Sequence, residues 1–312
     1  MKIGLDVMGG DYAPGAILEG AFDALGSLLP GEKIVLIGDE KAIREGANRE
    51  GVDISLFDLV PSTEVIEMGE HPARAFSQKK DSSIAVGYRL LKKGLIDGFA
   101  SAGNTGAMLI GASYTVNVIP GVFRPALVLA IPTSKGGKSV LLDVGLNPDC
   151  KPDVLLQYAK LGSLYARYVL EIDNPTVGLL NIGEEETKGS VAVRGAHELL
   201  KDYPAVNFIG NVEANVLFTG NMSDVVVCDG FVGNIIIKQG EAFYSIYKER
   251  KLEDEFFEKL NFEHFGGTPV VGINANVVIG HGISRRTAVK NMILQTRDVI
   301  NADLAIKIAE EI

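Results

Sequence analysis

The sequence is poor in the residues that bind metals or form disulfides. It has two cysteines, Cys150 and Cys228, and four histidines scattered along 312 residues. Neither residue type shows the spacing of a metal site, and two distant cysteines give no disulfide framework. We therefore expect no bound metal, and the low cysteine content suits a reducing compartment.

Long apolar runs and an excess of basic residues are also missing. No apolar stretch approaches the roughly 18 residues that span a bilayer, and no signal peptide precedes the strand-like residues 2–7. The net charge of −10 argues against general affinity for nucleic acid, which requires a basic surface. We expect a cytoplasmic protein that binds no nucleic acid, and 46% hydrophobic residues suffice for a large core.

Short apolar runs alternate with helical patterns along nearly the whole chain. This alternation is typical of strand–helix–strand units around a mostly parallel sheet, so the predicted fold class is α/β. Residues 1–312 are expected to form a single domain that ends in one long helix from residue 285. The expected strands are 3–7, 33–37, 54–60, 96–100, 177–180, 207–209, 225–228 and 270–279, with a hairpin of 126–131 and 139–144.

Two segments depart from this alternation. Residues 61–80 form a long polar stretch, which is typical of a lid or binding segment. Residues 239–265 carry apolar side chains at near-helical spacing among dense charges, which predicts one or two amphipathic helices that protrude from the main body. Their apolar face packs on the chain's own core, on a dimer mate or on a membrane, and the first two are favoured.

The loops that follow the expected strands are rich in Gly, Asn and Asp. In open α/β sheets, ligands bind beyond the carboxyl ends of the strands, so a set of such loops on one sheet edge predicts an active-site cleft. These loops are residues 9–11, 101–106, 145–147, 183–188, 211–215, 229–234 and 281–282.

The most distinctive of these loops runs from Ser101 to Gly106. Its glycines let a backbone approach a ligand closely, and the free amides at a helix start favour an anion such as phosphate. Ser101, Asn104 and Thr105 are either ligands of that anion or simple helix caps. The residues alone leave both readings open.

Common catalytic motifs are absent. Gly136-Gly137-Lys138-Ser139 resembles the end of a P-loop, but Pro132 stands where the first glycine is required. No nucleophile elbow surrounds Ser101 or Ser139, and no dinucleotide-binding fingerprint follows the first strand. Cys228 is a possible nucleophile, although its apolar strand favours a buried structural thiol.

Several blocks together resemble the bacterial phosphate acyltransferases of phospholipid synthesis, of the PlsX type. The resemblance spans nearly the whole chain, and the combination of blocks is far more specific than any single glycine turn. The blocks are Asp6-Val7-Met8-Gly9-Gly10-Asp11, Ser101 to Ala107, Asn181 to Glu185 with Lys188-Gly189, Val227 to Asn234, and His281-Gly282.

This resemblance implies a reaction in which inorganic phosphate and a fatty acyl chain on acyl carrier protein give acyl phosphate and free carrier. It also implies a three-layer α/β/α fold similar to isocitrate dehydrogenases and phosphate acetyltransferases. It further implies a homodimer, no metal or nucleotide cofactor, and a downstream membrane acyltransferase that uses the product. Transient contact with the membrane would follow from that partner.

Two features depart from the family pattern. The family usually has a lysine before a small residue and His-Gly, whereas this chain reads Ile279-Gly280-His281-Gly282. Any role of that lysine is absent here or has moved to Arg285 or Arg286. The segment after Asn234 is also shorter than the family's hydrophobic hairpin, which weakens the expectation of membrane attachment.

The chemistry of this reaction assigns roles to the candidate residues. Phosphate is already an anion, and a thiol with a pKa near roughly 8.5 leaves without a strong acid, so positioning and charge stabilisation remain to be supplied. We expect Lys188 to neutralise phosphate and Asn234 to stabilise the oxyanion. His281 protonates the sulfur, binds phosphate or is structural. The residues expected to bind substrate or orient these groups are Asp6, Gly9, Gly10, Asp11, Ser101, Gly103, Asn104, Thr105, Gly106, Asn147, Asp229 and Gly230.

Other functions remain to be weighed against this one. The nearest is a short-chain phosphate transacylase that uses coenzyme A thioesters. A non-catalytic scaffold that binds acyl carrier protein and a membrane enzyme through residues 239–265 is another, and a dehydrogenase of the related fold is disfavoured by the missing nucleotide motif. Basic residues for docking an acidic carrier would be Lys79, Lys80, Arg250 and Lys251.

Overall fold

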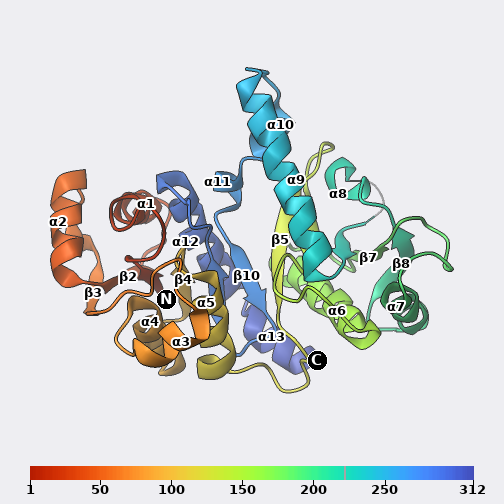
Figure 1. Ribbon diagram of the computed structural model, residues 1–312, viewed down its shortest axis with the longest axis horizontal. Coiled ribbons are helices and arrows are strands. Elements are labelled where there is room, and N and C mark those ends of the chain that lie inside the picture. The colour runs from red at the N-terminus through yellow and green to blue at the C-terminus, as the bar shows by residue number, and fades with distance from the viewer. Residues whose placement is uncertain (221–222) are drawn as a thin grey trace. The chain divides into compact units, whose positions relative to one another are not determined.

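The computed structural model describes residues 1–220 and 223–312 and confirms the predicted α/β fold class (Figure 1). The chain forms two compact units. Unit 1 comprises residues 1–118 and 263–301, and unit 2 comprises residues 119–262 and 302–312. Within each unit, most neighbouring strands are parallel. That they act together as the single catalytic domain expected above stays a prediction.

The sheet of unit 1 has the strand order β3-β2-β1-β4-β11-β10. All neighbours are parallel except β10 and β11. The helices α1, α2 and α12 cover one face, and α3, α4 and α5 cover the other (Figure 1). The strands are β1 (Lys2–Asp6), β2 (Lys33–Gly38), β3 (Asp58–Pro61), β4 (Gly98–Ser101), β10 (Thr268–Val271) and β11 (Asn276–Ile279). The helices are α1 (Gly15–Leu25), α2 (Glu40–Glu50), α3 (Pro72–Gln78), α4 (Ser83–Lys92), α5 (Thr105–Gly111) and α12 (Arg286–Asn301), and a π-helical turn (Ala112–Val116) follows α5.

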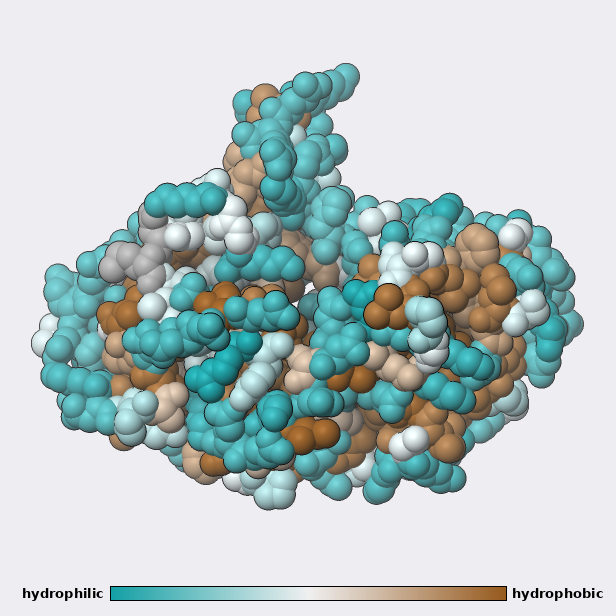
Figure 2. Space-filling view, turned by 180° about the vertical axis from the view of Figure 1, so that it is seen from behind, coloured by the Kyte–Doolittle hydropathy of each residue, from teal (hydrophilic) through white to brown (hydrophobic). Residues whose placement is uncertain are grey.

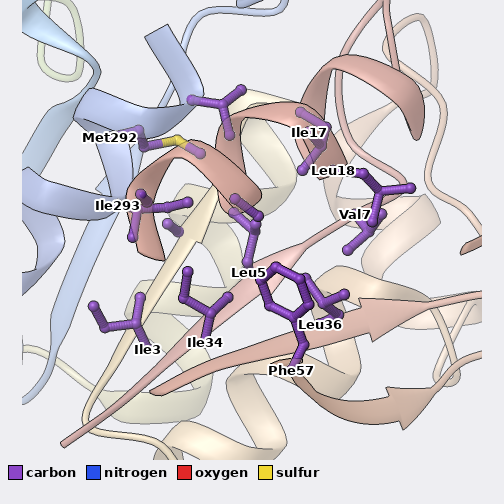
Figure 3. Packing of buried hydrophobic residues seen from close by; sticks show 14 of the residues in the cluster. Ile3, Leu5, Val7, Ile17, Leu18, Ile34, Leu36, Phe57, Met292 and Ile293 are labelled. Atoms are coloured by element: carbon purple, nitrogen blue, oxygen red, sulfur yellow. The ribbon is translucent and has the colours of Figure 1, made fainter. Parts of the chain in front are cut away.

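Alternation along β1 builds the core of this unit. Ile3, Leu5 and Val7 point to the face that α1 and α12 cover and are fully buried (Figure 3). Burial of each such side chain stabilises the fold by roughly 1.5–3 kcal/mol. Asp6 lies between them in sequence, so its side chain points to the opposite face. The strand therefore ends with a carboxylate on the α4 side of the sheet.

The sheet of unit 2 has the strand order β5-β6-β9-β7-β8. The predicted hairpin is confirmed, because β5 and β6 pair antiparallel, and the remaining neighbours are parallel. The strands are β5 (Ala126–Pro132), β6 (Lys138–Leu142), β7 (Thr176–Leu180), β8 (Asn207–Val212) and β9 (Val225–Val227). The helices are α6 (Pro152–Tyr168), α7 (Val191–Lys201), α8 (Val216–Thr219), α9 (Gly230–Glu249), α10 (Glu255–Lys259) and α13 (Leu304–Glu311), and α11 (Phe262–Phe265) lies where the two units join in sequence.

Three predicted elements differ from the structure. The strand 270–279 is two antiparallel strands, β10 and β11, because Gly272 takes a φ of +89° and turns the chain between them. The long terminal helix is divided into α12 and α13 at Asp303, whose left-handed φ of +49° interrupts the helical hydrogen bonds. Residues 54–56 form a 3-10 turn, and β3 begins only at Asp58.

The polar segment 61–80 is ordered by contacts with its neighbours. It contains α3, and the Lys79 ammonium group donates to the Val65 carbonyl and to the Glu70 carboxylate, each at 2.6 Å. The Lys79–Glu70 pair lowers the pKa of Glu70. The part of the segment before α3 is therefore held against the end of that helix and is not an open loop.

The segment 239–265, for which one or two amphipathic helices were expected, forms the outer part of α9 together with α10 and α11. The buried Tyr247 ring stacks on Phe257 of α10 with centroids 5.3 Å apart, so α10 folds back on α9. Phe243 and Leu252 remain 56% and 55% exposed. Figure 2 shows hydrophobic and hydrophilic side chains side by side on this segment, which extends beyond the sheet of unit 2. Among the described residues, no helix has the length and apolar character to cross a membrane.

Candidate active site

Three of the predicted loops meet at one edge of the unit 1 sheet. The strands β1, β4 and β11 are adjacent and parallel, so their carboxyl ends point the same way. The loops that follow them, residues 7–11, 102–106 and 280–282, therefore lie together. A backbone bond from the Asp11 amide to the Gly282 carbonyl, 2.8 Å, joins the first of these loops to the third.

A buried carboxylate ties the first loop to the second. Asp6 is fully buried and accepts a 2.6 Å hydrogen bond from the Ser101 hydroxyl and a 3.0 Å bond from the Met8 amide. The Ser101 oxygen in turn accepts from the Gly103 amide at 3.0 Å. Burial raises the pKa of Asp6, against the hydrogen bonds from Ser101, Ser83, Met8 and Gly9. The buried side chains of Asp6 and Ser101 therefore fix the backbone at the start of the loop 102–106.

Glycine is required where these loops pass each other. A Cβ at Gly9 would overlap the Asp6 carboxylate and lie 2.6 Å from the Gly103 nitrogen. Gly10 takes a φ of +104°, which side chains rarely adopt. At Gly103, a Cβ would lie 3.1 Å from both Asp6 and Ser101. Glycine at these positions therefore lets the two loops pack directly against each other.

Both polar atoms of the Asn104 side chain are hydrogen-bonded within the protein. Its oxygen accepts from the Ala107 amide at 3.0 Å and caps α5. Its amide nitrogen donates to the carbonyl groups of Glu67, Met68 and Glu70 at 3.0–3.2 Å. Thr105, by contrast, is exposed at the first position of α5. A Cβ at Gly106, the next residue, would overlap the Pro72 ring.

The third loop carries His281, which is exposed and accepts a weak 3.5 Å bond from the Ile283 amide through Nδ1. The preceding position has no room for a side chain, because a Cβ at Gly280 would lie 2.7 Å from the buried Met292 sulfur. Of the two arginines that follow, Arg286 is bound to the Asp23 carboxylate at 2.5 and 2.6 Å. The Arg285 guanidinium lies 3.7 Å from the centre of the ring of Tyr12, the residue that follows Asp11 in the sequence.

In unit 2, a second buried carboxylate organises the candidate residues. Asp143 accepts from the amides of Leu127 at 3.0 Å, Leu146 at 3.3 Å and Asn147 at 2.6 Å. Burial raises its pKa, and these same hydrogen bonds oppose the shift. The Asn147 side chain donates to the Pro125 carbonyl at 2.8 Å, and the Asn147 carbonyl accepts from the Gly230 amide at 2.8 Å. Asn147 thus holds a loop junction.

The start of α9 packs against this carboxylate. Asp229 caps the helix by accepting from the Val232 amide at 2.8 Å. A Cβ at Gly230 would lie 2.8 Å from Asp143, and one at Gly233 would overlap its carbonyl oxygen. Asn234 is exposed in the next position of α9, with its side chain beside Gly145. Nearby Cys228 is buried, and burial raises the pKa of its thiol, so the structure favours a structural thiol over a nucleophile.

Lys188 lies in the loop 181–190 that follows β7, and its side chain is exposed. The Asn181 side chain donates to the Lys188 carbonyl at 3.1 Å, and the Lys188 amide donates to the Glu185 carbonyl at 3.0 Å. A Cβ at Gly189 would lie 2.5 Å from the Asn181 oxygen, so glycine is needed here. The parallel strands β6, β9 and β7 place this loop, Asn147 and Asn234 beyond the same edge of the unit 2 sheet.

The predicted site residues therefore divide between the two units. Unit 1 holds His281 and the loops of Asp6 and Ser101, and unit 2 holds Lys188 and Asn234 with the Asp143 loop. Sequence reasoning missed Asp143 and Ser83, and it named Asn211 only as the start of the loop 211–215. An ionisable residue inside an apolar strand was the available signal for Asp143. Within residues 1–220 and 223–312, no group of three His, Cys, Asp or Glu residues is arranged to hold a metal ion.

Comparisons with known proteins agree with this architecture. The family described as "Fatty acid synthesis protein" matches residues 1–307. The chain is 41% identical over its whole length to a phosphate acyltransferase of Desulfitobacterium hafniense, covering 98% of that protein. It is 40% identical to a phosphate acyltransferase of Dictyoglomus turgidum, covering 99% of this chain and 97% of that one.

A solved phosphotransacetylase from Streptococcus pyogenes shares the fold, with a TM-score of 0.66 at 17% identity over 96% of this chain and 94% of that one. This likeness confirms the predicted fold relationship to phosphate acetyltransferases. The full-length identities confirm the resemblance drawn from the sequence blocks. The chain is thus an acyltransferase enzyme that belongs to the family of bacterial phosphate acyltransferases.

Proposed function

We propose that this enzyme transfers a fatty acyl group from acyl carrier protein to inorganic phosphate, yielding acyl phosphate and free carrier for phospholipid synthesis. The observation that carries the proposal is the 41% identity to a phosphate acyltransferase over the whole chain. The position of the loop 101–106 at the start of α5 supports it, because the first turn of a helix favours an anion.

In the proposed reaction, a phosphate oxygen attacks the thioester carbonyl carbon, and the carbon–sulfur bond breaks. The sulfur leaves as a thiolate and takes up one proton to give the carrier thiol. The loop 101–106 would hold phosphate through its backbone and the exposed Thr105 hydroxyl, since the side chains of Ser101 and Asn104 are already bonded within the protein. Asp6 orients this loop because its carboxylate is buried.

The charged intermediate needs stabilising groups that reach solvent. Lys188 and Asn234 are both exposed on unit 2, so we assign charge neutralisation to the first and the oxyanion contact to the second. His281 is exposed and is assigned to the leaving sulfur or to phosphate. Asp11 and Asp229 are assigned supporting roles, since bare carboxylates would repel phosphate. Asn147 is assigned one because its side chain is bonded to the Pro125 carbonyl.

The proposed partners follow from this chemistry. They are acyl carrier protein, a second copy of the chain in a homodimer, and a downstream membrane acyltransferase that consumes the product. We propose a cytoplasmic enzyme with transient membrane contact. Among the basic residues considered for carrier docking, Lys79 is engaged by Glu70, which leaves Lys80, Arg250 and Lys251 as the better candidates.

Incubation of the pure protein with long-chain acyl carrier protein and labelled phosphate tests the activity directly. Label should appear in acyl phosphate, and an acyl coenzyme A thioester should be a poorer donor. Faster turnover with short-chain coenzyme A thioesters would support the transacylase alternative. Absence of acyl phosphate from either donor would support a scaffold.

Lys188→Ala and Asn234→Ala test the assigned roles. Each should lower kcat by about 100-fold or more, the usual effect of losing a preorganised group at a developing charge. Lys138→Ala is a matched control, because Lys138 is an exposed lysine of the same unit at the start of β6. Turnover at the wild-type rate in both site variants would contradict the assignment.

A further inference from the structure

Two buried polar side chains lie behind the loop that carries Lys188. His197, on α7, is 4% exposed, and Asn211, on β8, is 5% exposed. The His197 Nδ1 atom and the Asn211 Oδ1 atom are 3.0 Å apart. Asn211 is paired in register with Leu179 of β7, so it lies beside the point where the loop 181–190 begins.

The hydrogen bonds of Asn211 lead directly to Lys188. The Asn211 amide nitrogen donates to the Glu185 carbonyl at 2.9 Å, and the Lys188 backbone amide donates to the same carbonyl at 3.0 Å. A carbonyl oxygen has two lone pairs and accepts both bonds. Because the Asn211 nitrogen faces Glu185, its oxygen faces the imidazole, and His197 must carry a hydrogen on Nδ1 to donate to it.

The backbone of Lys188 is thus fixed from both sides. Asn211 holds the carbonyl to which the Lys188 amide is bound, and Asn181 donates to the Lys188 carbonyl itself at 3.1 Å. The loop would otherwise have little to hold it, since residues 184–188 are exposed. Burying an imidazole and an amide is costly unless both are hydrogen-bonded, and an apolar pair would pack there without that cost.

We propose that His197 and Asn211 form a positioning pair that fixes Lys188 for phosphate transfer, an inference that rests on the function proposed above. The pair does not touch substrate. It acts by anchoring the Glu185 carbonyl, which sets where the Lys188 backbone lies and hence where its ammonium group can reach. Misplacing a reacting group by about 1 Å costs on the order of 100-fold in rate, so the anchor matters although it is remote from the chemistry.

A double-mutant cycle separates this role from a general loss of stability. Asn211→Leu should lower kcat by about 10- to 100-fold in the wild-type background and have almost no further effect in the Lys188→Ala background. Gln157→Leu is the control, because Gln157 is another buried amide of unit 2 that bonds to Gly121 and Phe123. An equal loss from Asn211→Leu in both backgrounds would overturn the inference.

Substitution of His197 provides a second arm. In His197→Asn, a side-chain amide N–H occupies nearly the place of Nδ1–H, so this variant should retain most of the activity that His197→Leu loses. If the two variants lose activity equally, the hydrogen bond to Asn211 is not what matters, and the inference fails.

Amide hydrogen exchange tests the inference by a measurement that does not depend on turnover. In Asn211→Leu, the amides of residues 185–188 should exchange faster, whereas in Gln157→Leu they should exchange as in the wild type. Unchanged exchange in Asn211→Leu would overturn the positioning pair even if the enzyme is active. If Asn211→Leu shows faster exchange but the wild-type protein forms no acyl phosphate from any donor, the proposed function is wrong and the anchor is real.

Discussion

Each unit of the molecule builds its candidate loops around a buried aspartate at the end of a buried parallel strand, but the two carboxylates are reached by different donors. Asp6 in unit 1 accepts from the hydroxyl groups of Ser101 and Ser83 and from two backbone amides, those of Met8 and Gly9. Asp143 in unit 2 accepts from the backbone amides of Leu127, Leu146 and Asn147. Burial raises the pKa of both groups.

We call each buried aspartate together with its hydrogen-bond donors a knot. The difference in donors determines how far each knot tolerates substitution of its aspartate. A hydroxyl that loses its acceptor can rotate toward another one, whereas a backbone amide cannot move without moving the chain. A buried amide left without a partner costs about 1–3 kcal/mol. The unit 2 loop therefore depends more strongly on its carboxylate than the unit 1 loop does.

The largest effect expected from this comparison is that of Asp143→Ala. It leaves the amides of Leu127, Leu146 and Asn147 without their acceptor and should lower the free energy of unfolding by about 3–6 kcal/mol. Asp6→Ala should cost about half as much, because hydroxyl donors can reorient. Urea unfolding of both variants measures the difference, with Asp143→Asn expected in between. Equal losses for the two alanine variants would remove the distinction between the knots.

The two knots also show what the sequence could and could not reveal. Asp6 was singled out because it begins the sequence block Asp6 to Asp11 that resembles the family. Asp143 was missed because it lies between Leu142 and Val144 and reads as the interior of a strand, although β6 ends at Leu142. Alternation and turn residues predict where a strand runs, but not which side chain at its end becomes buried.

Long-range contacts are a second kind of information that the sequence does not show. Asn104 was expected to be an anion ligand or a helix cap; its oxygen caps α5, and its amide nitrogen is bonded to the carbonyl groups of Glu67, Met68 and Glu70, more than thirty positions away. No local pattern shows such partners. The positions of most strands and helices were predictable, because hydrophobic periodicity is local. The break at Asp303 was not, because its left-handed conformation has no signal in the residue type alone.

The next smaller effect concerns whether unit 1, like unit 2, supplies a cation that binds phosphate. The Arg285 guanidinium stacks on Tyr12 beside the glycine loop, whereas Arg286 is bound to Asp23. Arginine binds phosphate through paired donors, so Arg285→Ala should raise the KM for phosphate by about 10-fold with little change in kcat. Steady-state kinetics at varied phosphate measure this.

The Arg285 prediction has two controls. Tyr12→Leu removes the ring beneath the guanidinium and should reproduce part of the increase in KM, whereas Tyr12→Phe should not. Arg286→Ala should leave the KM for phosphate near its wild-type value. If Arg286→Ala raises the KM and Arg285→Ala does not, the cation of unit 1 has been assigned to the wrong arginine.

The smallest effect concerns pH and treats the two knots alike. A carboxyl whose pKa is raised on folding stabilises the protein most below its unfolded pKa, near 3.8 here, and that contribution is lost as pH rises through the folded pKa. Relative to wild type, Asp6→Asn and Asp143→Asn should each gain unfolding free energy as pH rises from about 4 to neutral, superimposed on any constant loss. Asp173→Asn, at an exposed position, is the control. Because the two carboxylates belong to separate units with separate hydrogen-bond networks, the gains should add in the double variant. A double variant whose pH dependence is no flatter than that of either single variant would mean that one shared event, and not two independent knots, controls the response to pH.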